Sequence, residues 1–432
     1  MDSSGQPPPP VVPGGGIRSR PPGASGRGLS LNRTFAALRH RNYRLFFCGQ
    51  FVSLVGTWMQ NVAQAWLVYA LTNSPFKLGV VSFCSGVPAL AFSLWAGVLA
   101  DRTPKRRLLL VTQAVMMTLA FLLAAYVFLG TVAWWHVGIL AFCLGTANAF
   151  DAPTRQAFVA EMVDREELMN AIALNSAMFN SARIIGPALA GITLATMGAQ
   201  WCFVLNGVSF LAVIAGLALM DVRPYVGAPS SESPLHQMRE GVGYIWHHPT
   251  VRPLITLVAV SNLFSFGYMA LLPAFAQDVL GVGSVGFGFM STAVGLGALA
   301  GALILASLGN SQRKGRILTA GNLIFPAMVV AVALSRSFHL TLACLAVAGF
   351  GFMTQNATTN TLVQTTVPDQ LRGRVMSVYM MVFLGFYPIG ALIAGTVAEG
   401  FGLPAGAAFG GLIGLAYGLY VFWRYPAIRA LR

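Results

Sequence analysis

The sequence predicts an all-α membrane protein in which twelve transmembrane helices form two pseudo-symmetric six-helix bundles. Three observations support this class: an excess of apolar residues, twelve long apolar segments, and a sequence echo between the two halves of the chain. Of the 432 residues, 56% are hydrophobic and only 9% are charged, whereas soluble domains carry roughly a quarter charged residues. The composition therefore excludes a globule surrounded by water.

Twelve apolar segments are long enough to cross a bilayer, which takes about 20 residues of helix. They lie at about 45–71, 77–100, 107–129, 133–155, 168–197, 201–221, 254–279, 284–308, 316–335, 338–361, 372–398 and 402–423. Prolines within them are tolerated because neighbouring helices satisfy the backbone groups that a proline frees. The segments are too long for barrel strands and do not alternate in polarity, so we expect helices.

Lysines and arginines favour one side of this arrangement. With a cytoplasmic N-terminus, all but three of the 27 lysines and arginines fall in cytoplasmic segments, and the exceptions are Lys77, Arg336 and the span residue Arg183. An excess of these residues marks cytoplasmic loops. We therefore expect a multi-pass protein of a bacterial inner membrane with both termini in the cytoplasm.

The predicted spans divide the chain into five parts. We expect a disordered basic tail at 1–34, a six-helix bundle at 35–221, a cytoplasmic linker with a surface helix at 222–253, a second bundle at 254–425 and a cytoplasmic tail at 426–432. The two bundles echo each other at an offset near half the chain length, since Trp135-His136 is answered by Phe338-His339. Two six-helix repeats around a midplane site are an arrangement typical of transporters.

Two short motifs point to helix contacts and gating. In the loop after the second span, Gly97 allows close helix approach, and Asp101 followed by Arg102 can cap a helix or pair across the seam between the bundles. Anchoring at the anionic inner leaflet explains the following basic run, but not Asp101. In the fifth span, Gly186-Pro187 and Gly191 permit close packing and a bend beside a cavity, although packing alone also produces this pattern.

These motifs resemble those of the major facilitator superfamily. The loop is similar to its G-x-x-x-D-R-x-G-R-[RK] motif, with Pro104 where glycine is common, and the Gly-Pro-x-x-x-Gly core resembles the fifth-helix signature of its antiporters. Further segments resemble the subgroup that contains the enterobactin exporter: 56–60, 66–69, 151–156, 167–171, 183–191, 240–249 and 367–376. The resemblance spans roughly 35–425. It implies that Asp101 braces a cytoplasmic gate.

The same resemblance implies a secondary active transporter. Its cargo would be a small amphiphilic or anionic molecule, such as a siderophore, a drug or a secondary metabolite, exported by proton antiport and alternating access. The sequence leaves open an importer or uniporter of the same fold, and a membrane scaffold that transports nothing. The proton would be carried by Asp101 or Asp151, titrating from the inner side, or the coupling to protons would be indirect.

Arg183 is the most informative single residue. It lies about 22 Å into its predicted helix at 1.5 Å per residue, where a charge is costly and usually faces a wet cavity or a partner. Two interpretations are equally supported: Arg183 anchors an anionic group of the substrate, or it forms a structural pair with a buried acid or with the carbonyls of an unwound turn. Asp151 and Arg155 lie four residues apart on one helix face, and they are a gate network or a plain surface pair.

Polar residues in the middle of the spans are the remaining candidates for substrate binding. As a set they indicate a polar lumen, although each alone is typical of a hydrogen bond between helices. They are Gln60, Asn61, Gln64, Asn180, Asn262, Tyr268, Gln355, Asn356 and Tyr379. Nearby aromatic residues would suit a large amphiphilic ligand.

Enzyme and nucleic-acid functions find no support. The sequence has no spacing of metal ligands, no nucleophile triad, no P-loop and no dinucleotide-binding glycine motif. We therefore expect no metal, no cofactor and no nucleic acid. The expected partners are a small-molecule substrate, protons and the lipid bilayer, with the protein acting as a monomer.

Overall fold

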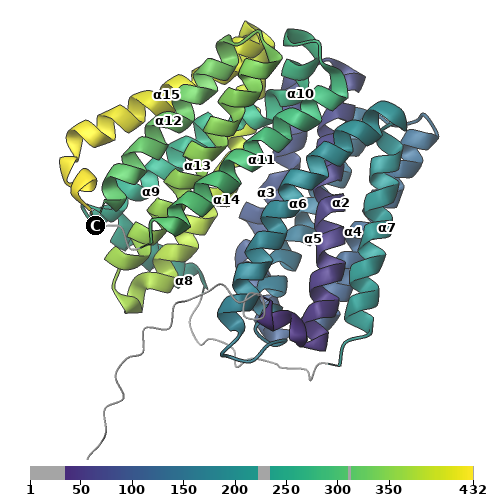
Figure 1. Ribbon diagram of the computed structural model, residues 1–432, viewed down its shortest axis with the longest axis horizontal. Helices are drawn as coiled ribbons and strands as arrows, with labels where there is room; N and C mark the ends of the chain where they lie inside the picture. The colour runs from purple at the N-terminus through teal and green to yellow at the C-terminus, as the bar shows by residue number, and fades with distance from the viewer. Residues whose placement is uncertain (1–34, 222–233, 310–312, 432) are drawn as a thin grey trace, which may run out of the picture.

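The computed structural model describes residues 35–221, 234–309 and 313–431 of the chain. Every regular element in this part is a helix (Figure 1). The predicted disordered tail at 1–34 and residues 222–233 of the predicted linker lie outside the described residues.

The helices before the linker pack among themselves. They are α2 (Arg41–Thr72), α3 (Pro75–Arg102), α4 (Lys105–Phe128), α5 (Trp134–Val159), α6 (Leu168–Thr196) and α7 (Ala199–Ala218), preceded by the short η1 (Ala36–Arg39). Here α2 packs against α6 and α7, α3 against α5, and α4 against α5 and α7. We refer to residues 35–221 as the first half.

Residues 234–431 form the second half. Their helices are α8 (Pro234–His247), α9 (Val251–Val260), η2 (Ser261–Ser265), η3 (Phe266–Leu271), α10 (Leu272–Ala274), η4 (Phe275–Val279), α11 (Gly283–Ser307), α12 (Lys314–Leu334), α13 (Phe338–Thr366), α14 (Asp369–Phe401), α15 (Leu403–Arg424) and η5 (Pro426–Ala430). Here α11 and α12 pack against α13, and α12 also packs against α15. At the linker end, α8 rests on α14, where Glu240 pairs with Arg374.

Nine helical segments of the described chain are long and apolar enough to cross a membrane. The three other long helices, α2, α5 and α6, carry more polar residues inside their apolar runs, and these lower their mean hydropathy; Gln60, Asp151 and Arg183 are examples. Predicted and observed bounds agree closely, as for the fifth span, predicted at 168–197 and observed at Leu168–Thr196. The protein is an all-helical, multi-pass membrane protein.

Two helix pairs join the halves. Along one seam α3 packs against α14, and along the other α6 packs against α11. Glycines make both approaches possible: a Cβ atom on Gly86 would overlap Pro388, and one on Gly288 would lie 2.6 Å from the carbonyl oxygen of Pro187. The two seams enclose the site described next.

Candidate functional site

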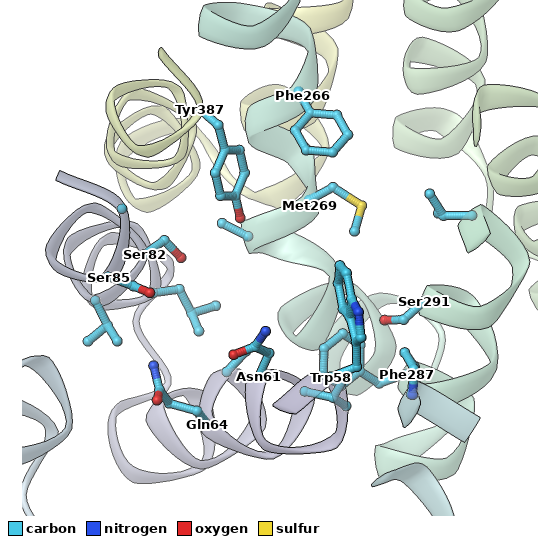
Figure 2. Close-up of a pocket in the computed structure, with 18 of the residues that line it drawn as sticks. Trp58, Asn61, Gln64, Ser82, Ser85, Phe266, Met269, Phe287, Ser291 and Tyr387 are labelled. Atoms are coloured by element: carbon cyan, nitrogen blue, oxygen red, sulfur yellow. The ribbon is translucent and has the colours of Figure 1, made fainter. Parts of the chain in front are cut away.

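A cavity of about 360 Å³ lies between the two halves (Figure 2). Its walls come from α2, α3 and α6 of the first half and from η3, α11, α13 and α14 of the second. This volume falls within the range of small-molecule pockets, about 300 to 1,000 Å³. Since both halves line the cavity, a change in their relative orientation reshapes it.

The first-half wall is polar along one face of α2. Trp58, Asn61 and Gln64 follow at intervals of three residues, which places them on neighbouring turns of the same helix face. Figure 2 shows all three projecting from one helix, with Ser82 and Ser85 of α3 across the space from Asn61. This wall supplies amide and hydroxyl groups beside one large aromatic ring.

Arg183 of α6 is the one charged side chain among the described residues that line the cavity. Its helix is held close to α2, because a Cβ atom on Gly186 would lie 2.5 Å from the Cβ atom of Trp58. Pro187 follows in the lining, and α11 approaches the same turn, where Thr292 donates a hydrogen bond of 3.2 Å to the carbonyl oxygen of Ile184. The arginine therefore sits on a segment that is fixed on two sides.

The second-half wall begins with an irregular helix. Pro273 has no N–H to bond the carbonyl oxygen of Met269, and the N–H of Leu272 bonds that oxygen instead in a 3-10 turn. Two π-helical turns, η2 and η4, flank this segment, and such turns often mark functional sites. The irregularity brings Phe266 and Met269 to the cavity (Figure 2).

Aromatic rings dominate the rest of this wall. The ring of Phe266 stacks on that of Phe352, with centroids 4.3 Å apart, and Phe287 of α11 stacks on Trp66 of α2 across the seam. The hydroxyl of Tyr387 points into the cavity on the side of Ser82 of the opposite half (Figure 2). The wall offers flat apolar surfaces with one hydroxyl at its edge.

Beyond the cavity, the end where α2 meets α3 is joined to the second half by two carboxylates. Asp278 of η4 accepts a hydrogen bond from the Tyr69 hydroxyl. Glu399 of α14 accepts from the Ser74 hydroxyl at 2.9 Å and from the backbone N–H of Phe76 at 3.1 Å. We refer to these contacts as the Tyr69–Ser74 latch, since they hold the halves together at this end.

Three of the ten predicted substrate-binding residues line the cavity: Asn61, Gln64 and Arg183. The others lie outside the lining, and three of them bond neighbouring helices. Gln60 accepts from Asn206 at 2.6 Å, Gln355 donates to Ser261 at 2.8 Å, and Tyr379 donates to the carbonyl oxygen of Asn356 at 3.1 Å. Asn180, Asn262 and Asn356 each donate to a carbonyl oxygen four residues earlier in their own helix. Tyr268 is buried next to the cavity.

The predicted gate residues fall into two groups. Gly186 packs against Trp58 of α2 within the first half, whereas Pro187 and Gly191 both pack against Gly288 of α11 at the seam between the halves. Asp151 is 1% exposed and accepts hydrogen bonds from Thr112 and Gln113, while its other oxygen lies 3.9 Å from Arg155.

The end of α3 beyond the cavity differs from our expectation. No described atom lies within 4 Å of a Cβ atom built on Gly97, so none of the described helices packs closely against this position. Arg102 is exposed there at the last residue of α3, and the side chain of Asp101 lies outside the described part of the structure.

Sequence reasoning missed several lining residues. Ser82, Ser85 and Ser291 look like ordinary small packing residues within apolar helices, and nothing in their spacing singles them out. The latch acids lie outward of the predicted lumen, although Tyr69 and Asp278 are both within a few residues of a predicted span end. Their shared position at the outer ends of two spans is the one feature of the sequence that could have predicted a contact between Tyr69 and Asp278.

Comparison with protein families settles the kind of protein that this site belongs to. Residues 32–430 match the family model described as transmembrane secretion effector, which belongs to the major facilitator superfamily. The chain is a member of this family. It is therefore a membrane transporter of an efflux-type family, and not an enzyme.

Relatives with similar sequences are transporters of siderophores and drugs. The chain is 27% identical to the staphyloferrin A transporter of Staphylococcus aureus, covering 83% of this chain and 90% of that protein. It is 28% identical to the multidrug efflux pump Tap of Mycolicibacterium fortuitum (80% and 86% covered) and 24% identical to the enterobactin exporter EntS of Shigella flexneri (87% and 91%).

Solved structures share the fold at lower sequence identity. The peptide transporter POT matches with a TM-score of 0.72 at 14% identity, over 90% of this chain and 95% of that one. A bacterial homologue of the human lysosomal transporter Spinster matches with a TM-score of 0.67 at 14% identity, over 94% and 98%. These likenesses show the fold alone.

Proposed function

We propose that this protein exports a small amphiphilic or anionic molecule, of the siderophore, drug or secondary-metabolite kind, across a bacterial inner membrane. The observation that carries the proposal is the cavity between the halves, which combines one arginine with aromatic walls and a few amides and hydroxyls. The names of the relatives, which include a staphyloferrin A transporter, an enterobactin exporter and drug efflux proteins, support the same cargo class.

All twelve long helical segments span the membrane in this proposal, six in each half, with both termini in the cytoplasm and a monomer as the working unit. The distribution of lysines and arginines supports this orientation. Rocking of the halves about the two seams would expose the cavity to each side in turn. The Tyr69–Ser74 latch would then close the side facing away from the cytoplasm.

Proton antiport supplies the energy in this proposal. Protons entering from outside reach Asp278 and Glu399 at the latch, while those leaving inside reach Asp101 or Asp151. A protonated carboxyl group is a weaker hydrogen-bond acceptor than a carboxylate. Protonation of Asp278 or Glu399 therefore weakens the contacts of the latch and favours separation of the halves. Indirect coupling through the substrate charge is the alternative route.

Transport in proteoliposomes tests the proposal. Purified full-length protein is reconstituted, and flux of 2,3-dihydroxybenzoate and of an amphiphilic dye is followed with and without an imposed pH gradient. We expect flux that rises with the gradient and is lost in Ser291→Trp, whose added indole fills the cavity. Equal flux with and without the gradient would remove antiport, and absence of any flux would remove export.

A further inference from the structure

The charge of Arg183 is unbalanced inside the cavity. No Asp or Glu occurs among the described lining residues, and the electrostatic partner of the guanidinium is the hydroxyl group of Tyr268. A charge removed from water is costly unless an opposite charge or several hydrogen bonds compensate it. The cavity therefore has a positive potential that an anion would neutralise.

Tyr268 provides a second polar group without a partner, beside Arg183. Its side chain, carried by η3 of the second half, is 2% exposed, and its hydroxyl has no hydrogen-bond partner in the described part of the chain. A buried hydroxyl without a partner is destabilising. Tyr268 itself lies behind the lining, directly before the lining residue Met269 on η3, and it interacts electrostatically with Arg183. An oxyanion bound at Arg183 would therefore lie beside a second donor that has no partner.

The surroundings of the pair favour an aromatic body. Trp58, Phe287 and the stacked rings of Phe266 and Phe352 line the cavity beside it. Flat rings attract one another in stacked and edge-to-face arrangements. Within the described lining, the same walls hold no acidic group that would compensate an ammonium ion.

We propose that Arg183 and Tyr268 together bind the carboxylate or phenolate of an aromatic substrate, so that the exported class is anionic and excludes organic cations. This inference rests on the proposed function, whose cargo class it narrows. Arg183 belongs to α6 and Tyr268 to η3, so a bound oxyanion bridges the two halves. Rocking that separates the pair weakens binding, which couples release of the substrate to the change of state.

Three probes of matched shape test the charge preference: 2-naphthoate, neutral 2-naphthamide and 2-naphthylmethylammonium. Binding to the purified full-length protein is measured by calorimetry. We expect wild type to bind the naphthoate about ten- to a hundredfold more tightly than the other two, because charge-assisted hydrogen bonds are the strong ones. Equal or tighter binding of the ammonium probe, or no binding of the naphthoate, would overturn the proposal.

Variants assign the preference to the two residues. Arg183→Gln should lose the preference for naphthoate while keeping affinity for the amide, which also shows that the cavity is folded. Tyr268→Phe should weaken naphthoate binding about tenfold, and the double variant should bind it no more weakly than Arg183→Gln alone. Arg44→Gln removes an exposed arginine from α2 and should change nothing. A naphthoate preference that survives Arg183→Gln contradicts the assignment.

Flux measurements separate this inference from the proposed function. If the binding preference holds but no probe crosses proteoliposome membranes, export fails and the oxyanion site stands. If wild type transports the ammonium probe as fast as the naphthoate, export stands and the oxyanion site fails.

Discussion

The two halves of the molecule bury their polar groups differently at matching positions. Asp151 and Gln355 each lie 17 residues after the first residue of their helix, α5 and α13. In the first half the buried carboxylate accepts two hydrogen bonds of 2.9 Å, from Thr112 and Gln113. In the second half the buried amide donates to Ser261, and its own oxygen has no partner among the described residues. One half therefore holds a charge where the other holds a neutral group.

The opening helices of the halves differ as well. The first half begins with α2, a continuous α-helix of 32 residues. The corresponding segment of the second half, Val251–Val279, is interrupted by two π-helical turns and a 3-10 turn. Since irregular turns have weaker backbone hydrogen bonds, we expect Val251–Val279 to deform more easily than α2.

Removal of the buried charge should give the largest effect. Asp151→Ala leaves two buried donors and Arg155 without their acceptor, so we expect a loss of about 2 to 4 kcal/mol in the free energy of unfolding. Gln355→Ala in the second half removes a neutral hydrogen bond and should cost about 1 kcal/mol. Thermal unfolding of both purified variants in the same detergent measures the difference.

Asp151→Asn is the matched control, because it keeps the shape and one acceptor oxygen. Its stability should lie between those of wild type and Asp151→Ala. If Asp151→Ala and Gln355→Ala lose equal stability, the contrast between a charged and a neutral half has no energetic basis.

The two halves should depend on close helix packing to a similar degree, although their polar networks differ. A Cβ atom on Gly145 would overlap the carbonyl oxygen of Ser85, and one on Gly297 would overlap that of Ala346. Gly145→Ala and Gly297→Ala therefore push apart the equivalent helix pairs α3–α5 and α11–α13, and each should cost about 1 to 3 kcal/mol. Gly97→Ala, with open space around its Cβ position inside α3, is the control and should leave the unfolding temperature unchanged or slightly raised, because alanine favours a helix over glycine.

At the Tyr69–Ser74 latch the charge asymmetry is reversed, since the second half supplies both acids. Tyr69→Phe removes the hydrogen bond to Asp278 and should shift the equilibrium between conformations by about 0.5 to 1.5 kcal/mol toward separation at this end. Distances between spin labels on the outer ends of α3 and α14 report the shift. Thr196→Val, which alters a hydroxyl bonded within its own helix, should leave the distances as in wild type.

The sequence predicted the helices well because the bilayer imposes one rule on every span. About 20 apolar residues must form a helix that satisfies its own backbone, and this rule is visible in a single chain. The same rule drew attention to Arg183, because a charge within an apolar span is costly and usually faces a cavity or a partner. The echo between the two halves, at an offset near half the chain length, predicted their division into two bundles.

Which polar residues face the cavity was not predictable from the sequence. Gln60 and Asn61 are neighbours on α2, yet Gln60 bonds Asn206 of α7 while Asn61 lines the cavity. A helix turns by about 100° per residue, so this outcome depends on which helices stand beside α2. The contacts of Tyr268 likewise depend on the irregular turn before Pro273, which no spacing rule describes.

Restoring regular geometry to the seventh span should give the smallest effect on stability and the most direct test of the contrast in stiffness. Pro273→Ala returns an N–H that can bond the carbonyl oxygen of Met269, so we expect a gain of less than about 1 kcal/mol in the free energy of unfolding. Hydrogen exchange of the amides at 266–279 should slow toward that of α2, and transport should slow as well, because Phe266 and Met269 lose their freedom to move at the cavity wall. Unchanged exchange at 266–279, or transport that quickens, would mean that deformation of this helix is no part of the cycle.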